Sequence, residues 1–183
     1  MKRRIVPVLF WACVFALPGI ADPSARGGER PTHRNDYHGF EFNYPDACAI
    51  RDRSGRSEKF VFLTLLLKGR PGGVEVQLAD SKDFSVAGLC AADGECSVDC
   101  EVKGNSKIDA GDFSGRRYQL ISVTTCEDAP PKKKPVPPVY VIDIGEGRSL
   151  VFSQVFADPR SSFPDEILTA LFKTLKRTAR TGS

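Results

Sequence analysis

The chain has 183 residues, with 26 lysines and arginines against 23 aspartates and glutamates. This length favours one domain with a hydrophobic core of its own. Lys2, Arg3 and Arg4 precede the first acidic residue, Asp22, and removing them leaves 23 basic and 23 acidic residues. A neutral remainder argues against binding to nucleic acid or to an anionic membrane through net charge.

Residues 1–21 have the pattern of a secretory signal peptide. The basic residues 2–4 precede an apolar run over 5–17, and Gly19-Ile20-Ala21 places small residues before a cleavage after Ala21. A retained N-terminal anchor is the alternative, although the run is shorter than the about 20 residues of a membrane span. We predict an exported protein, periplasmic or secreted, without a stable membrane span after cleavage.

Composition divides the rest of the chain. Residues 22–36 are polar and rich in Gly, Pro and Arg, which predicts a flexible leader. Residues 37–178 are expected to form one domain and residues 179–183 a tail. The two histidines, His33 and His38, lie at the end of the leader, where we expect solvated side chains.

Alternating apolar and polar residues predict a strand over 39–45, ended by Pro45, and a short strand around Cys48. The apolar run 59–68 predicts a central strand buried on both faces. A glycine-rich turn at 69–73 and alternation over 74–78 complete a hairpin.

The middle of the chain lacks periodicity, so residues 80–112 are expected to be irregular, with one or two helical turns at 84–90. A strand follows over 117–125. Five prolines and three lysines over 129–138 predict a loop with polyproline-like stretches.

Strands at 139–144 and 149–156 are joined by a tight turn at 145–148. A helix is expected from Pro164 to Arg177, with Asp165 and Glu166 in its first turn. Its apolar residues share one face that must pack on the sheet: Ile167, Leu168, Leu171, Phe172 and Leu175.

These elements predict an α+β fold, with a mostly antiparallel sheet of about six to seven strands covered on one face by the C-terminal helix. The segment Gly39-Phe40-Glu41-Phe42-Asn43-Tyr44-Pro45, with the hairpin and helix near the C-terminus, resembles PsbP/Mog1-like domains over residues 37–177. The resemblance implies an α/β sandwich that acts as an accessory or binding module without catalysis, and no site residue carries over.

Five cysteines remain after Cys13 leaves with the signal peptide: Cys48, Cys90, Cys96, Cys100 and Cys126. In an exported protein they are disulfide candidates. We favour one bridge within residues 90–100 and another from that segment to Cys126 or Cys48. The odd thiol is then buried, pairs with another chain, or is reactive.

The same segment raises metal and redox alternatives. Cys90, Cys96 and Cys100, with Cys126 or His38, could ligate zinc, but the spacing is long for zinc and export favours oxidation. Asp93, Glu95, Asp99 and Glu101 could bind calcium, without an EF-hand pattern. No C-x-x-C motif is present. We therefore predict no catalytic residue, metal or cofactor.

Lys132, Lys133 and Lys134 form a basic run between prolines and are candidates for partner binding. The sequence thus favours a non-catalytic, monomeric accessory domain whose partner, a protein or small ligand, is unknown. A small thiol- or metal-dependent enzyme and a structural component of an envelope assembly are the alternatives.

Overall fold

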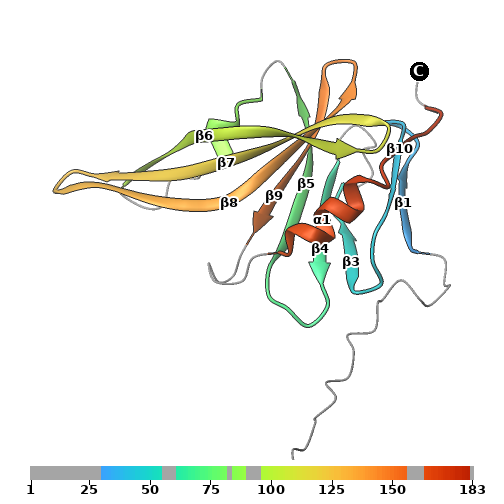
Figure 1. Cartoon of the computed structure of the whole chain (residues 1–183), viewed down its shortest axis with the longest axis horizontal. Coiled ribbons are helices and arrows are strands. Elements are labelled where there is room, and N and C mark those ends of the chain that lie inside the picture. The colour runs from blue at the N-terminus through green and yellow to red at the C-terminus, as the bar shows by residue number, and fades with distance from the viewer. Residues whose placement is uncertain (1–29, 55–60, 82–83, 90–95, 156–162, 182–183) are drawn as a thin grey trace, which may run out of the picture.

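The computed structural model describes residues 30–54, 61–81, 84–89, 96–155 and 163–181. Its main feature is an antiparallel sheet of seven strands in the order β3-β4-β5-β9-β8-β7-β6 (Figure 1). The strands are β3 (Cys48–Asp52), β4 (Phe62–Leu67), β5 (Gly73–Asp80), β6 (Ser97–Ala110), β7 (Phe113–Cys126), β8 (Ala129–Gly145) and β9 (Arg148–Val155). The predicted antiparallel sheet of six to seven strands is therefore present.

A second, three-stranded sheet lies beside it. It contains β1 (Thr32–Asn35), β2 (Phe40–Asn43) and β10 (Lys176–Arg177), with β2 in the centre. The flexible leader therefore does not extend to residue 36 as expected, because Thr32–Asn35 pairs with β2. The predicted signal peptide lies outside the described residues.

The C-terminal helix is shorter than predicted. Helix α1 spans Asp165–Phe172, after Pro164 and with two acids in its first turn. The Thr174 hydroxyl donates a hydrogen bond to Leu171 O (2.7 Å) and accepts one from Asn43 N (2.9 Å), so the chain leaves the helix beside β2. Leu175 is buried as the apolar pattern indicated, but it lies after the end of the helix, between the turn at 173–174 and β10.

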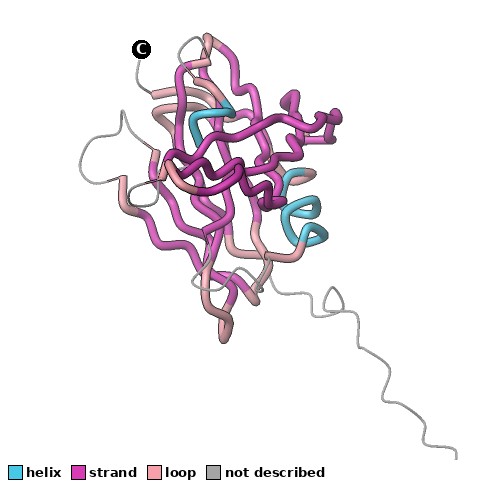
Figure 2. Tube along the Cα trace, turned by 90° about the vertical axis from the view of Figure 1, so that its left-hand side faces the viewer, coloured by secondary structure: helices cyan, strands magenta, loops and turns pink. Residues whose placement is uncertain are grey.

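Helix α1 lies on one side of the main sheet (Figure 2). The Phe172 ring centroid lies 4.9 Å from that of Phe152 and 5.0 Å from that of Tyr140. We call this side of the sheet the helix face. Because side chains alternate along a strand, Val151, next to Phe152, belongs to the opposite face. No helix in the described ranges is long and apolar enough to cross a bilayer.

The opposite face carries a second, smaller apolar cluster of Cys100, Leu120, Val139 and Val151. The 3-10 helix η2 (Val86–Leu89) packs against it, which confirms a helical turn in this region. Helix α1 and the small sheet cover one face of the main sheet, and η2 covers part of the other. The predicted fold, with the C-terminal helix on one face only, is therefore confirmed in part.

Two predictions about single strands are wrong. Residues 97–110, expected to be irregular, form the 14-residue strand β6. Their many polar side chains fit an edge strand, whose exposed face needs no apolar alternation. Strand β4 is not buried on both faces, because buried and half-buried residues alternate along Phe62–Leu67.

The expected proline-rich loop at 129–138 is a strand, the first half of β8. Tyr118 pairs with Val139 and Leu120 with Val136, so Pro137 and Pro138 lie together in a bulge opposite one residue of β7. Pro130 and Pro131 occupy a second bulge in the same way. Strand β9 pairs with β8 only from Tyr140 to Gly145. The prolines of β8 lie before this stretch, so their lack of an N–H group removes no hydrogen bond between β8 and β9.

A tight turn between β6 and β7 contacts the C-terminal segment. Gly111 has φ +63°, and a Cβ there would lie 2.0 Å from Leu175 O, the atom that accepts a hydrogen bond from Asp112 N. A side chain would therefore displace backbone on both sides of this contact.

We predict that Gly111→Ala lowers the free energy of unfolding by roughly 3 kcal/mol, because positive φ and a backbone clash add. Gly69→Ala is the matched control, since Gly69 has φ +77° and open space around it. It should lower the free energy of unfolding by about 1–2 kcal/mol, through conformational strain alone. Denaturant unfolding measures both, and equal losses would contradict the described Leu175 contact.

Candidate functional site

The ends of β6, β7 and β8 project beyond the body of the molecule as a three-stranded extension (Figure 1). We define the arm as residues 97–102 of β6, 120–126 of β7 and 129–136 of β8. The arm unites the two segments that the sequence singled out, the cysteine-rich segment and the lysine run, which lie far apart in the chain. It is therefore the candidate site.

A disulfide joins two strands at the end of the arm. Cys96, just before β6, is bonded to Cys126 at the end of β7, with an S–S distance of 2.00 Å. This is a bridge of the predicted kind, from the cysteine-rich segment to Cys126. Cys100 is also disulfide-bonded, and its partner lies outside the described residues, as Cys90 does.

These bonds contradict a zinc site built on the same cysteines. The sulfur atoms of Cys96, Cys100 and Cys126 are in disulfides, so they are not thiolate ligands. Asp99 and Glu101 lie on one face of β6, while Asp93 and Glu95 lie outside the described residues. Within the described part of the chain, no group of three or more His, Cys, Asp or Glu residues could hold a metal ion.

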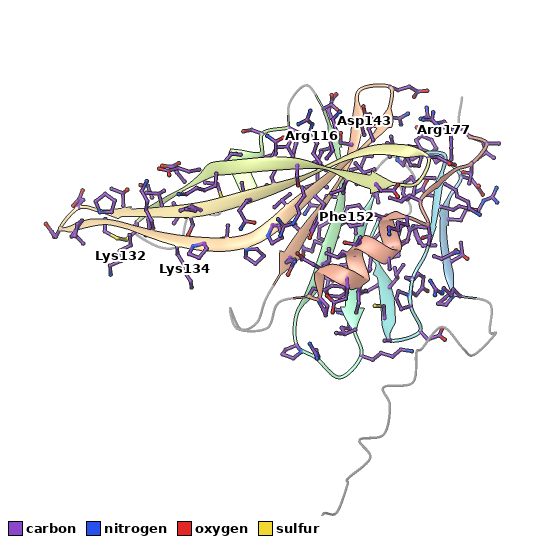
Figure 3. The ribbon with its side chains drawn as sticks, viewed as in Figure 1. Arg116, Lys132, Lys134, Asp143, Phe152 and Arg177 are labelled. Atoms are coloured by element: carbon purple, nitrogen blue, oxygen red, sulfur yellow. A yellow bond between two sulfur atoms is a disulfide. The ribbon has the colours of Figure 1, made fainter. Side chains whose placement is uncertain are left out.

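The lysine run divides between the two faces of the arm. Lys132 pairs with Thr124, Lys133 with Val123 and Lys134 with Ser122. Paired residues share a face and neighbours alternate, so Lys132 and Lys134 share one face and Lys133 points to the other. Figure 3 shows Lys132 and Lys134 on the same side of the arm.

Lys133 has a partner within the molecule. Its Nζ lies 2.9 Å from both carboxylate oxygens of Glu101 on β6. Lys132 and Lys134 are exposed and form no ion pair with any described residue. Among the described residues, two of the three lysines therefore lack an ionic partner, and the run lies on a strand instead of a loop.

A groove lies on the face that carries Lys132 and Lys134. Val136, two residues from Lys134, contributes to it together with its β7 partner Leu120. The groove has a volume of about 290 Å³ and is lined mostly by apolar side chains. Its lining is Leu89, Val98, Cys100, Leu120, Ser122, Val136, Pro137, Val139, Ser153 and Gln154. We call it the arm groove.

Sequence reasoning missed the arm groove because its walls come from β6, β7, β8 and β9 and from η2. Alternation in β7 indicated that Leu120 is buried, but the partners of β7 were unknown. The sequence signals for this site were the lysine run, whose prolines indicated a loop, and the disulfide candidate Cys100.

The histidines are not solvated as expected. His38 is buried, and its Nδ1 lies 2.9 Å from the Arg148 guanidinium, which can only donate, so Nδ1 is the acceptor. His33 packs on Phe42, with ring centroids 5.3 Å apart, and burial lowers the pKa of His33. Both rings belong to the packing of β1 and β2 and lie away from the arm.

A polar network ties α1 to the sheet beyond the arm. The Tyr140 hydroxyl donates to Asp165 (2.9 Å), and Arg117 forms an ion pair with the same carboxylate at 3.1 Å. Burial raises the pKa of Tyr140 to about 12. Tyr140 is 2% exposed, so this network holds the helix start on the sheet and presents no hydroxyl to solvent.

Cys48 is the free cysteine among the described residues. It is the first residue of β3, is 3% exposed and packs in the main core. Burial raises the pKa of the Cys48 thiol, an effect that nearby Lys68 only partly opposes. A nucleophilic thiol requires a lowered pKa and access, so this environment disfavours the thiol-enzyme alternative at Cys48.

No protein-family model matches the chain, and no curated protein gives a significant match. Among solved structures, the chain is similar to the solution structure of cyanobacterial PsbP (CyanoP) from Synechocystis sp. PCC 6803. The two share 12% sequence identity over 90% of this chain and 98% of that chain, with a TM-score of 0.47.

We predict that replacing both Cys96 and Cys126 by alanine lowers the free energy of unfolding by about 3 kcal/mol. Their bridge closes a segment with a sequence separation of 30, and its loss frees that segment in the unfolded chain. The exposed neighbours give the control, Ser97→Ala with Thr125→Ala, which should cost about 0.5 kcal/mol or less. Equal stability of the two variants in denaturant titrations would show that the arm does not need the bridge.

We predict that the Cys48 thiol of the folded protein is unreactive toward a water-soluble alkylating reagent at neutral pH and reacts after denaturation. Arg51→Cys places an exposed thiol on the same strand as a positive control. Peptide mapping by mass spectrometry identifies the modified residue. Rapid labelling of Cys48 in the folded protein would restore the thiol-enzyme hypothesis.

Proposed function

We propose that this protein is an exported, non-catalytic binding domain that docks an acidic segment of a partner protein on the groove face of its arm. The observation that carries the proposal is the position of Lys132 and Lys134. Both are exposed on one face of a paired strand, and neither forms an ion pair with a described residue. Cations held in this way attract and orient a partner of opposite charge.

The chemistry of the face favours an acidic polypeptide over other anions. Recognition of anionic lipid by basic clusters generally uses four to eight lysines or arginines, and this face of the arm offers two, Lys132 and Lys134. Nucleic acids also require a larger basic surface, whereas the mature chain is neutral overall. A short acidic segment needs only a few well-placed cations.

The disulfide supports export. Stable disulfides form in oxidising compartments such as the periplasm or the extracellular space and are rare in the cytosol. The Cys96–Cys126 bridge holds together the strands that carry the site, so the proposed function and the proposed location depend on the same bond.

The arm is also suited to binding by its rigidity. Lys132–Lys134 pairs with β7, and β7 pairs with β6 over the same stretch. The prolines restrict the backbone further, because each fixes its own φ. Side chains on such a strand lose less conformational freedom on binding than they would in a mobile loop.

We predict that replacing Lys132 and Lys134 by glutamine weakens binding of a fluorescent hexa-aspartate peptide about three- to tenfold at low ionic strength. Fluorescence anisotropy with the mature protein measures the affinity, which should fall as salt is added.

The control is the double variant Lys133→Gln with Lys173→Gln, which removes the same charge from the other face of the arm and from the end of α1. It should change the affinity by less than about twofold, because neither residue faces the groove. Equal weakening by both double variants would indicate non-specific attraction and contradict the proposal. Tight binding of anionic lipid vesicles without binding of the peptide would assign the arm to a membrane surface instead.

A further inference from the structure

We infer that the arm groove receives one large apolar side chain of the acidic segment, which gives the partner a defined sequence pattern. The inference rests on the proposed function and adds a specificity element to it. The pattern is an apolar residue with acidic residues two and four positions away, in an extended conformation.

The arm groove is small for a ligand site. Its volume of about 290 Å³ lies at the lower end of the about 300–1,000 Å³ of drug-sized pockets, and it can hold one large side chain. It also opens toward solvent on the same face as the lysines, so a neighbouring part of the same ligand can reach them.

The lining of the groove favours an apolar occupant. Leu120 is 1% exposed and Val139 is 5% exposed, so the walls are fixed by the smaller apolar cluster. Two polar side chains in the lining are already engaged: the Ser122 hydroxyl donates to Lys134 O (3.3 Å) and Gln154 Oε1 accepts from Phe163 N (3.0 Å). With Ser153 as the remaining polar residue of the lining, the walls offer a ligand mostly apolar surface.

The register of β8 sets the spacing. Val136, Lys134 and Lys132 share a face because their partners on β7 are Leu120, Ser122 and Thr124. Alternate residues of a strand lie roughly 7 Å apart. An extended peptide that follows β8 has the same repeat. When its apolar residue occupies the groove, its residues two and four positions further on lie opposite Lys134 and Lys132.

Three peptides of equal length and charge test this inference by anisotropy with the mature protein. The first contains aspartates at the two positions and only serine elsewhere. The second has leucine two positions before the first aspartate, and the third has leucine directly next to it. We expect the second peptide to bind about tenfold or more tightly than the first, from burial of one leucine side chain, and the third to gain little.

Ser122→Phe fills the groove without changing charge and should abolish the gain from leucine, measured as the ratio of the affinities of the leucine and serine peptides for the same variant. Val98→Phe provides a second filling variant at a different wall, and far-ultraviolet circular dichroism checks that each variant is folded. A leucine gain that persists in both folded variants, or no gain in the unmodified protein, would overturn the inference. Loss of binding by the serine peptide, or its independence of Lys132 and Lys134, would instead overturn the proposed function.

Discussion

The pairing of β7 with both of its neighbours is the constraint on which the rest of this structure depends. Strand β7 pairs with β6 from Phe113 to Thr125 and with β8 from Ser114 to Cys126. These two registers decide which side chains share a face, so they place Lys132 and Lys134 beside the groove and Lys133 beside Glu101. The disulfide between Cys96 and Cys126 joins β6 to β7 at the far end of these strands.

The same pairing explains how one sheet serves two purposes. Near the turn at Gly111, the strands belong to the body, where Tyr140 and Phe152 pack under α1 and close the main core. Towards Cys126 the strands leave that core, and the smaller apolar cluster on the opposite face supports the arm groove. The bulge at Pro137 and Pro138 lies near the point where β9 stops pairing with β8. Beyond this point only β6, β7 and β8 continue, and they form the arm.

Local sequence signals were sufficient where a single chain segment decides the structure. The hairpin turn at Glu146-Gly147, where both residues have positive φ, and the amphipathic start of α1 follow from composition and spacing alone. The sequence pattern gave wrong predictions where pairing with a distant strand decides the local structure. Prolines at 129–138 indicate a loop unless β7 supplies a register with two bulges, and the polar sequence of β6 indicates irregular chain unless it forms a sheet edge. Leu175 fits the helical spacing and is buried, although it lies beyond the end of the helix. The arm groove could not be predicted, since five separate elements form its walls.

The central claim is that residues 129–136 form a strand that presents Lys132 and Lys134 in fixed register with β7. Nuclear magnetic resonance of the oxidised mature protein tests it most directly, through cross-strand nuclear Overhauser effects between residues 122–124 and 132–134. The structure predicts contacts between Ser122 and Lys134 and between Thr124 and Lys132, with strand-like chemical shifts across the lysine run. Random-coil shifts for residues 129–138, without any contact to β7, would contradict the account and return this segment to the loop that its composition suggests.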